Sequence, residues 1–530
     1  DPTDHEEIWP MIVASRRNYL FVGESIDPND WQQGVTADQI YQRVIDGVHH
    51  EDGHIILLHD AGGDTRKPTI EALPRIIETL QHEGYQFISL EQYLGMNKQT
   101  LMPAINKGKA YYAMQTNLWL AEMIYHVSDF LTALFLVFLV LGMMRLIFMY
   151  VLTFREKRAE NRRNYAPIDA ATAPAVSIIV PGYNEEVNIV RTITTLKQQD
   201  YPNLHIYFVD DGSKDHTLER VREAFDTDDK VTVLAKKNGG KASALNYGIA
   251  ACRSEYVVCI DADTQLKQDA ISRLMKHFIA DKDKRIGAVA GNVKVGNQRN
   301  MLTYWQAIEY TSSQNFDRMA YSNINAITVV PGAIGAFRKE VIEEVGGFTT
   351  DTLAEDCDLT MSINEHGYII ENENYAVAMT EAPETLRQFV KQRIRWCFGV
   401  MQAFWKHRSS LFSPSKKGFG LWAMPNMLIF QYIIPTFSPL ADVLMLIGLF
   451  SGNALQIFFY YLIFLLIDAS VSIMAYIFEG ERLWVLLWVI PQRFFYRWIM
   501  YYVLFKSYLK AIKGELQTWG VLKRTGHVGE

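Results

Sequence analysis

Cysteine is scarce in this sequence, and an excess of basic residues is absent. The 530 residues include four cysteines, Cys252, Cys259, Cys357 and Cys397, whose scattered spacing matches no zinc-binding motif. These features exclude a disulfide framework and favour reduced, buried thiols. The 52 lysine and arginine residues are outnumbered by 59 aspartate and glutamate residues, which gives a net charge of −7. A nucleic-acid-binding protein normally carries a basic surface, so this balance argues against a nucleic-acid partner.

Long apolar runs are present. Residues 117–152 form the first of them, which is long enough to cross a lipid bilayer, since a helical span takes about 20 residues. Basic residues follow directly, at Arg155, Lys157, Arg158, Arg162 and Arg163. The positive-inside rule therefore predicts that residues 1–110 lie outside the cytoplasm and that the chain after residue 155 lies inside it. A buried core helix is the alternative, but soluble helices are seldom apolar on all sides at this length.

Further apolar runs occupy 421–450, 454–478 and 483–505, within a membrane region that we place at 421–508. The third run is interrupted by Arg493 and Arg497, and charges at bilayer depth normally face protein, water or a substrate path. We therefore regard both arginines as hypothetical channel-lining residues. Three full spans would put the basic tail at 509–530 outside, whereas a re-entrant or interfacial third segment would put it inside. The sequence leaves both arrangements open.

Between residues 170 and 384, short β-branched runs alternate with helical stretches. Strands that are apolar throughout and separated by helices predict a buried, mostly parallel sheet, and hence an α/β domain. Ligands of such domains bind at the carboxyl ends of the strands. In this sequence those ends carry "PGYNEE", "DDGSKD" and "DAD", so we expect the ligand site at this edge of the sheet.

Pairs of carboxylates stand at two of these strand ends: Asp210 with Asp211, and Asp261 with Asp263. Carboxylates from two strand ends can converge on one hard cation such as Mg²⁺ or Mn²⁺, which keeps positions open for phosphate oxygens. For either pair alone, an acidic turn that caps a helix is the alternative. Lys241 follows two glycines at the start of a helical stretch, where it could hold a diphosphate or simply be solvated.

The segment "LAEDCDLTM" supplies Glu355, Asp356 and Asp358 at the start of another helical stretch. Carboxylates at this position can cap the helix. One that is buried beside a metal-bound diphosphate can also serve as a general base.

A cationic and aromatic cluster lies within residues 385–420, shortly before the membrane region. If residues 385–408 are helical, Gln392, Arg395 and Trp396 share one face and Arg393 points elsewhere. A tryptophan face is a natural platform for a sugar ring, and the neighbouring arginine and glutamine can bind phosphate and hydroxyl groups. The alternative is an amphipathic helix that lies on the membrane surface. The two roles are compatible, because different faces can serve each.

The motifs "PGYNEE", "DDGSKD", "GGKASALN", "DADT", "AED" and Gln-x-x-Arg-Trp, in this order and followed by apolar runs, resemble a processive family-2 glycosyltransferase. The family includes cellulose, chitin, hyaluronan and poly-N-acetylglucosamine synthases. The resemblance implies an α/β, Rossmann-like nucleotide-diphospho-sugar transferase domain of the GT-A type at 170–384. It also implies that this domain lies on the cytoplasmic side of a multi-pass protein of the cell membrane.

The resemblance implies roles for individual residues as well. Asp356 would be the general base, with Glu355 beside it. The donor nucleotide would be held by Tyr183, Glu185, Asp210, Asp211, Lys241 and Asp261. Asp261 and Asp263 would bind Mg²⁺ or Mn²⁺, whereas Gln392, Arg395 and Trp396 would bind the diphosphate and the acceptor sugar. The threonine that is common before the Glu-Asp pair is Ala354 here, which leaves the base assignment intact.

Residues 1–110 resemble the closing part of a polysaccharide deacetylase of the family-4 carbohydrate esterase type, on the segments "ESIDPNDW" and "GHIILLHD". His59 matches the catalytic histidine of that family. The family's metal site uses an early aspartate and a His-x-x-x-His pair upstream of this segment, and no such histidine pair precedes Asp27, so we expect no deacetylation by this chain; His49, His50 and His54 come after Asp27. A half-fold would expose core surface. We therefore expect the natural protein to extend further toward its N-terminus, where a complete deacetylase could form.

These features predict a membrane-bound, inverting, processive β-glycosyltransferase that transfers sugar from a UDP-sugar to a growing polysaccharide. A deacetylase-like segment makes sense when the product carries N-acetyl groups, so UDP-N-acetylglucosamine is the favoured donor, with β-1,6-linked and chitin-like products both open. One alternative is a transferase that adds a single sugar to a polyprenyl phosphate, which would usually lack Gln-x-x-Arg-Trp. The other is a non-catalytic export subunit, in which the acidic motifs would be degraded.

Overall fold

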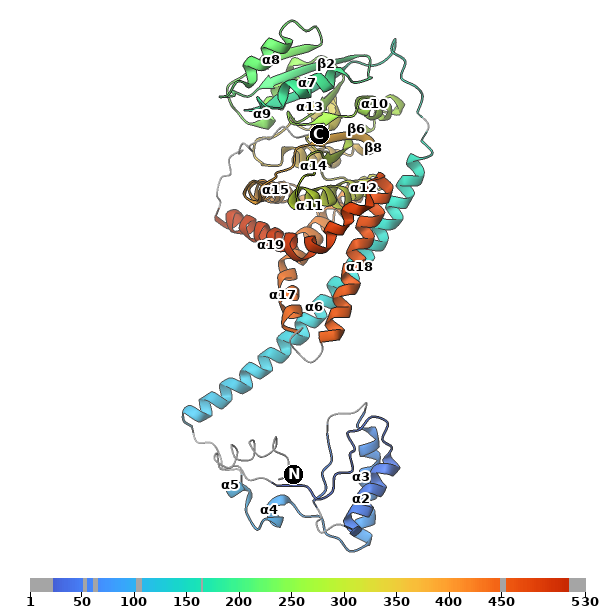
Figure 1. Ribbon diagram of the computed structural model, residues 1–530, viewed down its shortest axis with the longest axis vertical. Coiled ribbons are helices and arrows are strands. Elements are labelled where there is room, and N and C mark those ends of the chain that lie inside the picture. The colour runs from blue at the N-terminus through green and yellow to red at the C-terminus, as the bar shows by residue number, and fades with distance from the viewer. Residues whose placement is uncertain are drawn as a thin grey trace. The chain divides into compact units, whose positions relative to one another are not determined.

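The computed structural model describes residues 22–50, 55–60, 65–101, 107–163, 165–448 and 454–513. The chain divides into two compact units, Asp1–Val127 and Ser128–Glu530 (Figure 1). His54 and the part of the basic tail after residue 513 lie outside the described residues.

An eight-stranded sheet forms the centre of the second unit. Its strands are β1 Val176–Gly182, β2 Leu204–Asp210, β3 Val231–Ala235, β4 Tyr256–Cys259, β5 Gln265–Leu266, β6 Ile286–Val295, β7 Gly335–Arg338 and β8 Ile369–Thr380. They lie side by side in the order β3-β2-β1-β4-β7-β6-β8-β5. The expectation of a mostly parallel sheet is met by β3, β2, β1 and β4, whereas β7 runs antiparallel to both of its neighbours and β5 runs antiparallel to β8.

The parallel strands are buried because helices cover both faces of the sheet. All seven residues of β1 are buried, and successive side chains enter different cores: Ile178 packs in one hydrophobic cluster and Ile179 in the other. Helix α7, Ile189–Lys197, covers the first face and α9, Lys241–Ala251, covers the second. Burial on both faces explains why these strands read as continuous apolar runs rather than as alternating patterns.

The strand register aligns the carboxyl ends of the parallel strands. Gly182 of β1 pairs with Asp210 of β2, which pairs in turn with Ala235 of β3. Strand β4 ends at Cys259, opposite Ile179 of β1, so the chain after β4 leaves the sheet at the same edge. The loops that carry both aspartate pairs therefore emerge on one edge of the sheet, as expected for an α/β ligand site.

A layer of helices separates the sheet from the long apolar helices of the same unit (Figure 1). It contains α11 Met301–Glu309, α12 Phe316–Ser322, α14 Glu355–Glu365 and α15 Leu386–Lys406. Helix α15 begins where expected, because the Thr385 hydroxyl accepts a hydrogen bond from the amide of Gln388 and caps its N-terminus. This layer presents residues of the candidate site on its sheet-facing side and packs against apolar helices on the other.

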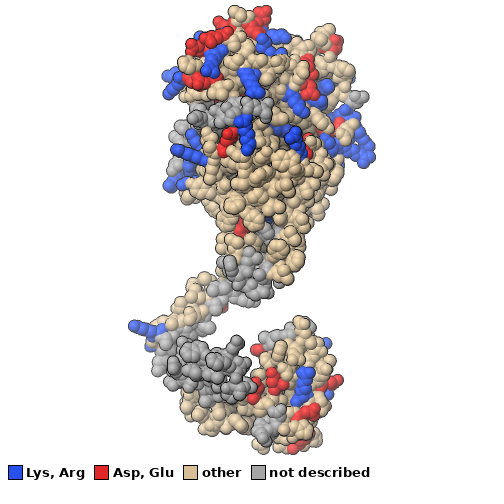
Figure 2. Space-filling view, viewed as in Figure 1, with Lys and Arg blue, Asp and Glu red and all other residues tan. Residues whose placement is uncertain are grey.

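Two helical stretches among the described residues have the length and composition needed to cross a membrane. They are Asp129–Glu160, which is the later part of α6 Lys109–Glu160, and Phe419–Leu446, which ends in α17 Ile434–Gly448. The most apolar window of the first is 0% buried and that of the second only 6% buried. Figure 2 shows charged side chains gathered over the sheet-bearing part of the unit, while the part formed by these helices is almost free of charge.

The remaining apolar runs form α18 Ala454–Glu479, a 3₁₀ turn at Leu483–Trp488 and α19 Val489–Lys513. Helix α19 packs against α15 and α11, and it also contacts α17. The guanidinium of Arg497 forms an ion pair with Asp442 of α17 at 3.3 Å and contacts the hydroxyl of Tyr501. This pairing gives Arg497 a structural role between two helices, and a channel-lining role for Arg493 and Arg497 stays a prediction.

The first unit contains two packed amphipathic helices, α2 Ala37–His50 and α3 Lys67–His82. Their buried faces meet in a small apolar core that includes Ile40, Val44 and Ile76. Of the strands that the deacetylase resemblance implies, the described residues show a single parallel bridge between Ile26 and Ile56. A lone strand pair without a further neighbour has little hydrogen bonding to stabilise it.

Candidate functional site

The two aspartates at the end of β2, Asp210 and Asp211, differ in the hydrogen bonds that their carboxylates accept. Asp211 is buried, and its carboxylate accepts hydrogen bonds from the Lys236 ammonium at 2.7 Å and from the backbone amides of Gly239 and Gly240 at 3.0 and 2.7 Å. It thereby holds the glycine turn that precedes α9. Sequence reasoning grouped Asp211 with the nucleotide ligands, but these contacts already occupy both of its oxygens.

Asp210 is differently placed. One oxygen, Oδ2, accepts hydrogen bonds from the amides of Gly212 and Ser213 at 3.1 and 3.2 Å. The other, Oδ1, is buried and has no hydrogen-bond partner among the described residues. A buried acceptor without a partner is uncommon in native proteins. Of the pair, Asp210 is therefore the residue with an oxygen left for a ligand.

The loop after β1 lies beside the loop after β2 and carries Tyr183 and Glu185. Asn184, between them, adopts a left-handed conformation with φ of 57°, and its amide donates to the Ser213 hydroxyl at 3.0 Å. The amide of Glu185 donates to the Thr217 hydroxyl at 2.8 Å. These bonds fix Tyr183 and Glu185 at the same edge as Asp210, as the sequence predicts.

Lys241 is the electrostatic centre of the site. The turn before it contains Gly240 with φ of 86°, a left-handed conformation that glycine adopts at little cost, and Lys241 is the first residue of α9. Its ammonium lies 2.6 Å from Asp261 Oδ1 and 3.2 Å from Glu355 Oε1. Burial alone would lower the pKa of Lys241, but the surrounding carboxylates of Asp261, Glu355 and Asp356 raise it overall. The ammonium therefore stays charged at neutral pH.

Asp356 lies on the first turn of α14, beside this ammonium. Its Oδ2 accepts a hydrogen bond from the amide of Gly332 at 3.3 Å, and its Oδ1 accepts one from the amide of Cys357 at 2.8 Å. Burial and the neighbouring Glu355 charge raise the pKa of Asp356 to about 6, while Lys241 opposes the rise. A carboxylate of this pKa is ionised at neutral pH and is a stronger base than an ordinary aspartate, which suits general-base catalysis.

Gly332 is a site residue that sequence reasoning missed. A Cβ atom at this position would lie only 2.5 Å from Lys241 Nζ, and 3.6 Å from Asp261 Oδ1. The absence of a side chain therefore lets the ammonium reach its two carboxylates. No motif in the sequence marks this glycine, because its importance depends on a contact with a residue 91 positions earlier.

Replacement of Gly332 by alanine is expected to lower the turnover of this site about 10- to 100-fold, because the new methyl group must push the Lys241 ammonium away from Asp261. The displaced atom is the end of a flexible side chain, so the melting temperature should change little. Turnover and thermal unfolding, measured on the same preparation, check both halves of this expectation. Wild-type turnover in the alanine variant would contradict the placement of Lys241.

Gln392, Arg395 and Trp396 share one face of α15, as predicted. Gln392 is buried, and its Oε1 has no hydrogen-bond partner in the part of the chain that the structure describes. Arg395 likewise makes no ion pair with any described residue. Trp396 packs beside Tyr310, with 6.4 Å between ring centroids. This face of α15 thus presents a hydrogen-bond acceptor on Gln392, a cation on Arg395 and an aromatic ring on Trp396.

Arg393 contacts both the ring of Trp396 and the neighbouring helix α11. Its guanidinium is buried, forms an ion pair with Glu309 of α11 at 2.8 Å, and lies 4.5 Å from the centre of the Trp396 ring. Sequence reasoning placed Arg393 off the functional face, and its ion pair with Glu309 directs it toward α11. Sequence reasoning missed the contact of the guanidinium with the indole of Trp396. The indole contact is one between neighbours at i and i+3, which helical periodicity could have indicated, whereas the ion pair with Glu309 depends on α11.

Asp261 and Asp263 follow β4, and their carboxylates are the hard oxygen ligands that Mg²⁺ and Mn²⁺ prefer. Asp263 is buried, whereas Asp261 is partly exposed. Among the described residues, three metal-ligating side chains lie close together only at Asp27, Asp30 and His59 of the first unit. Donors at this edge therefore suit an ion that takes one or two carboxylates and completes its shell with substrate phosphates.

Residues 174–399 match the family described as "Glycosyltransferase like family 2". These residues contain the sheet, the edge with both aspartate pairs, Lys241, Asp356 and the face of α15. The family model therefore matches the part of the chain that carries the candidate site.

The chain is also similar to individual curated proteins. The chain is 31% identical over 256 residues to the poly-beta-1,6-N-acetyl-D-glucosamine synthase of Staphylococcus epidermidis, an alignment that covers 48% of this chain and 62% of that protein. It is 32% identical over 260 residues to the synthase of the same name from Staphylococcus aureus strain COL, covering 49% of this chain and 61% of the relative. The chain thus spans about three fifths of the length of the curated relatives it matches.

Among solved structures, the mannosyltransferase PcManGT from Pyrobaculum calidifontis, in complex with GDP-Man and Mn²⁺, aligns with a TM-score of 0.47 and 24% identity. The alignment covers 66% of this chain and 95% of that chain.

Proposed function

We propose that the protein is a membrane-bound, inverting, processive β-glycosyltransferase that polymerises N-acetylglucosamine from UDP-N-acetylglucosamine. The observation that carries the proposal is the Lys241 ammonium held between Asp261 and Glu355, next to Asp356, within a glycosyltransferase family 2 domain. The names of the two staphylococcal relatives support N-acetylglucosamine as the sugar and a β-1,6 linkage for the product.

In this proposal the chain's own residues divide the work of one displacement reaction. Asp356 removes the proton from the acceptor hydroxyl as that oxygen attacks the anomeric carbon of the donor. Lys241 binds the diphosphate, and Arg395 compensates the charge that develops on the departing UDP. Gln392 and Trp396 hold the acceptor sugar. A divalent ion held by Asp261 and Asp263 would add electrostatic stabilisation of the diphosphate.

We propose that the family 2 domain lies in the cytoplasm and that the apolar helices anchor it in the cell membrane. Residues 129–160 and 419–446 support this placement by length and composition. The basic residues that follow the first of these support a cytoplasmic domain. The packing of α19 along α15 supports an interfacial third segment rather than a full span.

We also propose that the first unit is related to polysaccharide deacetylases. The ring of His59 lies 2.7 Å from Asp30, which is buried and also accepts a hydrogen bond from the Thr69 hydroxyl at 2.9 Å. This pair joins the two segments on which the resemblance depends.

The test is an incubation of the purified full chain in lipid nanodiscs with radiolabelled UDP-N-acetylglucosamine or UDP-glucose in the presence of Mg²⁺. We expect label from UDP-N-acetylglucosamine in a long polymer, no incorporation in excess chelator, and recovery when Mg²⁺ or Mn²⁺ is restored. A short, lipid-extractable product would instead identify a transferase that makes single additions. No incorporation from either donor would overturn the enzymatic proposal.

A further inference from the structure

One face of α15 continues beyond Trp396 and packs against the segment that leads into α14. Gly399, Gln402 and Lys406 follow Trp396 at helical spacing and therefore lie on the same side of the helix. A Cβ atom on Gly399 would lie 2.7 Å from the backbone nitrogen of Ala354, so the two backbones are in direct contact. Ala354 immediately precedes Glu355 and Asp356.

Polar bonds extend this contact toward the end of α15. The side-chain oxygen of Gln402 accepts a hydrogen bond from the amide of Leu353 at 3.1 Å. The ammonium of Lys406 contacts Asp351 at 3.1 Å and Asp358 at 2.9 Å. The chain before α14 is thus fixed to α15 by backbone packing, by a hydrogen bond and by ion pairs.

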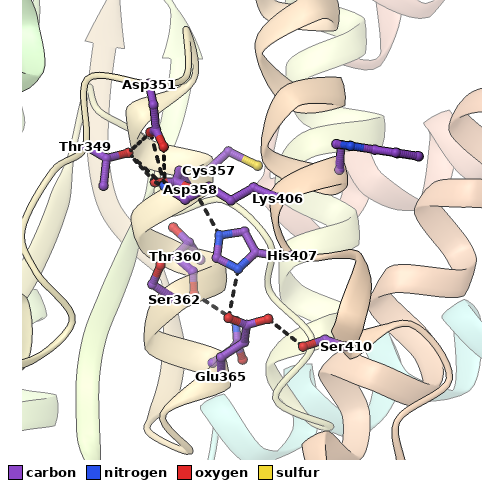
Figure 3. Close-up of polar contacts among 12 residues, drawn as sticks. Thr349, Asp351, Cys357, Asp358, Thr360, Ser362, Glu365, Lys406, His407 and Ser410 are labelled. Carbon is purple, nitrogen blue, oxygen red and sulfur yellow. Dashed lines mark hydrogen bonds and ion pairs between the residues drawn. The ribbon is translucent and has the colours of Figure 1, made fainter.

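His407, at the end of α15, also binds α14 (Figure 3). Its imidazole is buried between two carboxylates of α14: Nε2 lies 2.9 Å from Asp358 and Nδ1 lies 2.8 Å from Glu365. An ionised carboxylate has no proton to donate, so both ring nitrogens must donate, which requires an imidazolium. The ring therefore joins two points of α14 that are two helical turns apart to the end of α15.

The two carboxylates that receive the imidazolium are themselves fully engaged. The Asp358 side chain is buried and accepts further bonds from Thr349 at 2.5 Å and from Lys406. Glu365 accepts a bond from the Ser410 hydroxyl at 2.5 Å. Removing one partner from a buried charge network leaves another charge uncompensated, which costs more than the loss of an exposed pair. Loss of any one partner would therefore leave a buried charge of this network without compensation.

We propose that His407, together with Lys406, is a positioning residue for the transfer reaction. The two residues hold α14 against α15, so that Asp356 keeps a fixed place relative to the face formed by Gln392, Arg395 and Trp396. The inference rests on the proposed function, because it assigns the base to one helix and the acceptor site to the other. Rates of such reactions fall about 100-fold for a displacement of roughly 1 Å, so a rigid connection between the two helices has a direct effect on turnover.

The network also makes the connection sensitive to alkali. Burial alone would lower the pKa of His407, but its hydrogen bonds with Asp358 and Glu365 raise it to about 9. The other charged groups at this place, among the described residues, are Lys406, which contacts Asp358 and Asp351, and Lys416, which donates to the backbone of Glu365. Because the pKa in the folded protein is raised, the stabilisation is complete below about pH 6.5, the ordinary value, and is lost as the pH rises to about 9.

The test is the His407→Gln variant of the full chain in nanodiscs, with His366→Gln as the matched control. His366 is exposed and follows Glu365 directly, and within the described part of the chain its ring bonds only the carbonyl of Ser362 in its own helix. We expect His407→Gln to lower kcat about 10- to 100-fold. The KM for UDP-N-acetylglucosamine should stay within about threefold of wild type. We expect wild-type activity to fall near pH 9 as His407 loses its proton, and this fall should be absent from His407→Gln. His366→Gln should behave as wild type.

A second variant covers the case in which His407→Gln does not fold. Lys406→Met removes a partly exposed ammonium and leaves the buried imidazolium in place, so we expect a folded protein with a smaller loss of kcat. Wild-type kcat in both variants, or an equal loss in His366→Gln, overturns the positioning role. If the wild-type protein transfers no sugar, the proposed function fails and the catalytic part of this inference fails with it. UDP binding and the pH dependence of thermal unfolding between pH 6.5 and 9 then decide whether the two helices are fastened as described.

Discussion

Replacing Asp356 by asparagine is expected to reduce the rate of sugar transfer about 10²- to 10⁴-fold, the usual effect of removing a general base. Asparagine is nearly isosteric and can still accept the hydrogen bond from the Gly332 amide, so the position of Lys241 should be kept. The KM for the donor should therefore change little, and the loss should appear in kcat. Incorporation of labelled N-acetylglucosamine at saturating donor measures it.

The same substitution should not destabilise the fold. The pKa of Asp356 is raised to about 6, above its ordinary value near 3.8, so the folded protein disfavours the ionised form. Stability contributed by this group therefore falls as the pH rises through that window, and a neutral side chain avoids the cost at neutral pH. We expect asparagine to leave the melting temperature unchanged or slightly higher. A clear drop would show that the carboxylate is mainly structural.

The pH profile separates a base from a structural carboxylate more sharply. In the wild type, kcat should decline below about pH 6 as Asp356 becomes protonated. The asparagine variant should lose this acidic limb. Asp226→Asn, at an exposed position directly after helix α8 (Thr217–Phe225), is the matched control and should keep wild-type kcat and its acidic limb. Wild-type turnover by Asp356→Asn would remove the base assignment.

Much of the architecture around Asp356 can be predicted from local patterns. Continuous apolar strands between helices indicate a parallel sheet, and the carboxyl ends of parallel strands necessarily share one edge. That argument brings Asp210 and the segment after β4 together without any knowledge of tertiary contacts. Helical spacing likewise places Gln392 and Trp396 on one face of α15. Patterns of period two and 3.6 are properties of neighbouring residues, so one sequence is enough to read them.

Residues whose role depends on distant partners could not be predicted in this way. Asp211 has the same sequence signature as Asp210, and only the fold of the glycine turn shows that its oxygens are occupied by backbone amides. Gly332 and His407 belong to no motif, because each acts through a residue on another element. The antiparallel strand β7 is equally hidden, since strand composition does not encode direction.

Replacing Lys241 by methionine is expected to lower kcat/KM by about 10³-fold or more, because in the proposed function Lys241 binds the diphosphate and its charge stabilises the leaving group. Two further consequences follow from its ion pairs with Asp261 and Glu355. Those carboxylates lose their compensating charge, so the melting temperature should fall. Lys241 also opposes the rise of the Asp356 pKa, so the acidic limb of activity should move above pH 6.

Lys237→Met is the matched control, because Lys237 is exposed in the same loop and its side chain makes no ion pair with the described residues. It should bind UDP and transfer sugar as the wild type does. Calorimetric titration with UDP and Mg²⁺ measures the binding loss in Lys241→Met directly, and kcat at several pH values measures the shifted limb. Lys241→Arg keeps the charge but not the shape, and the space beside Gly332 is narrow, so it should recover the melting temperature better than turnover. If Lys241→Met binds UDP normally, Lys241 does not bind the diphosphate. The proposed orientation of the donor at this edge of the sheet is then wrong as well.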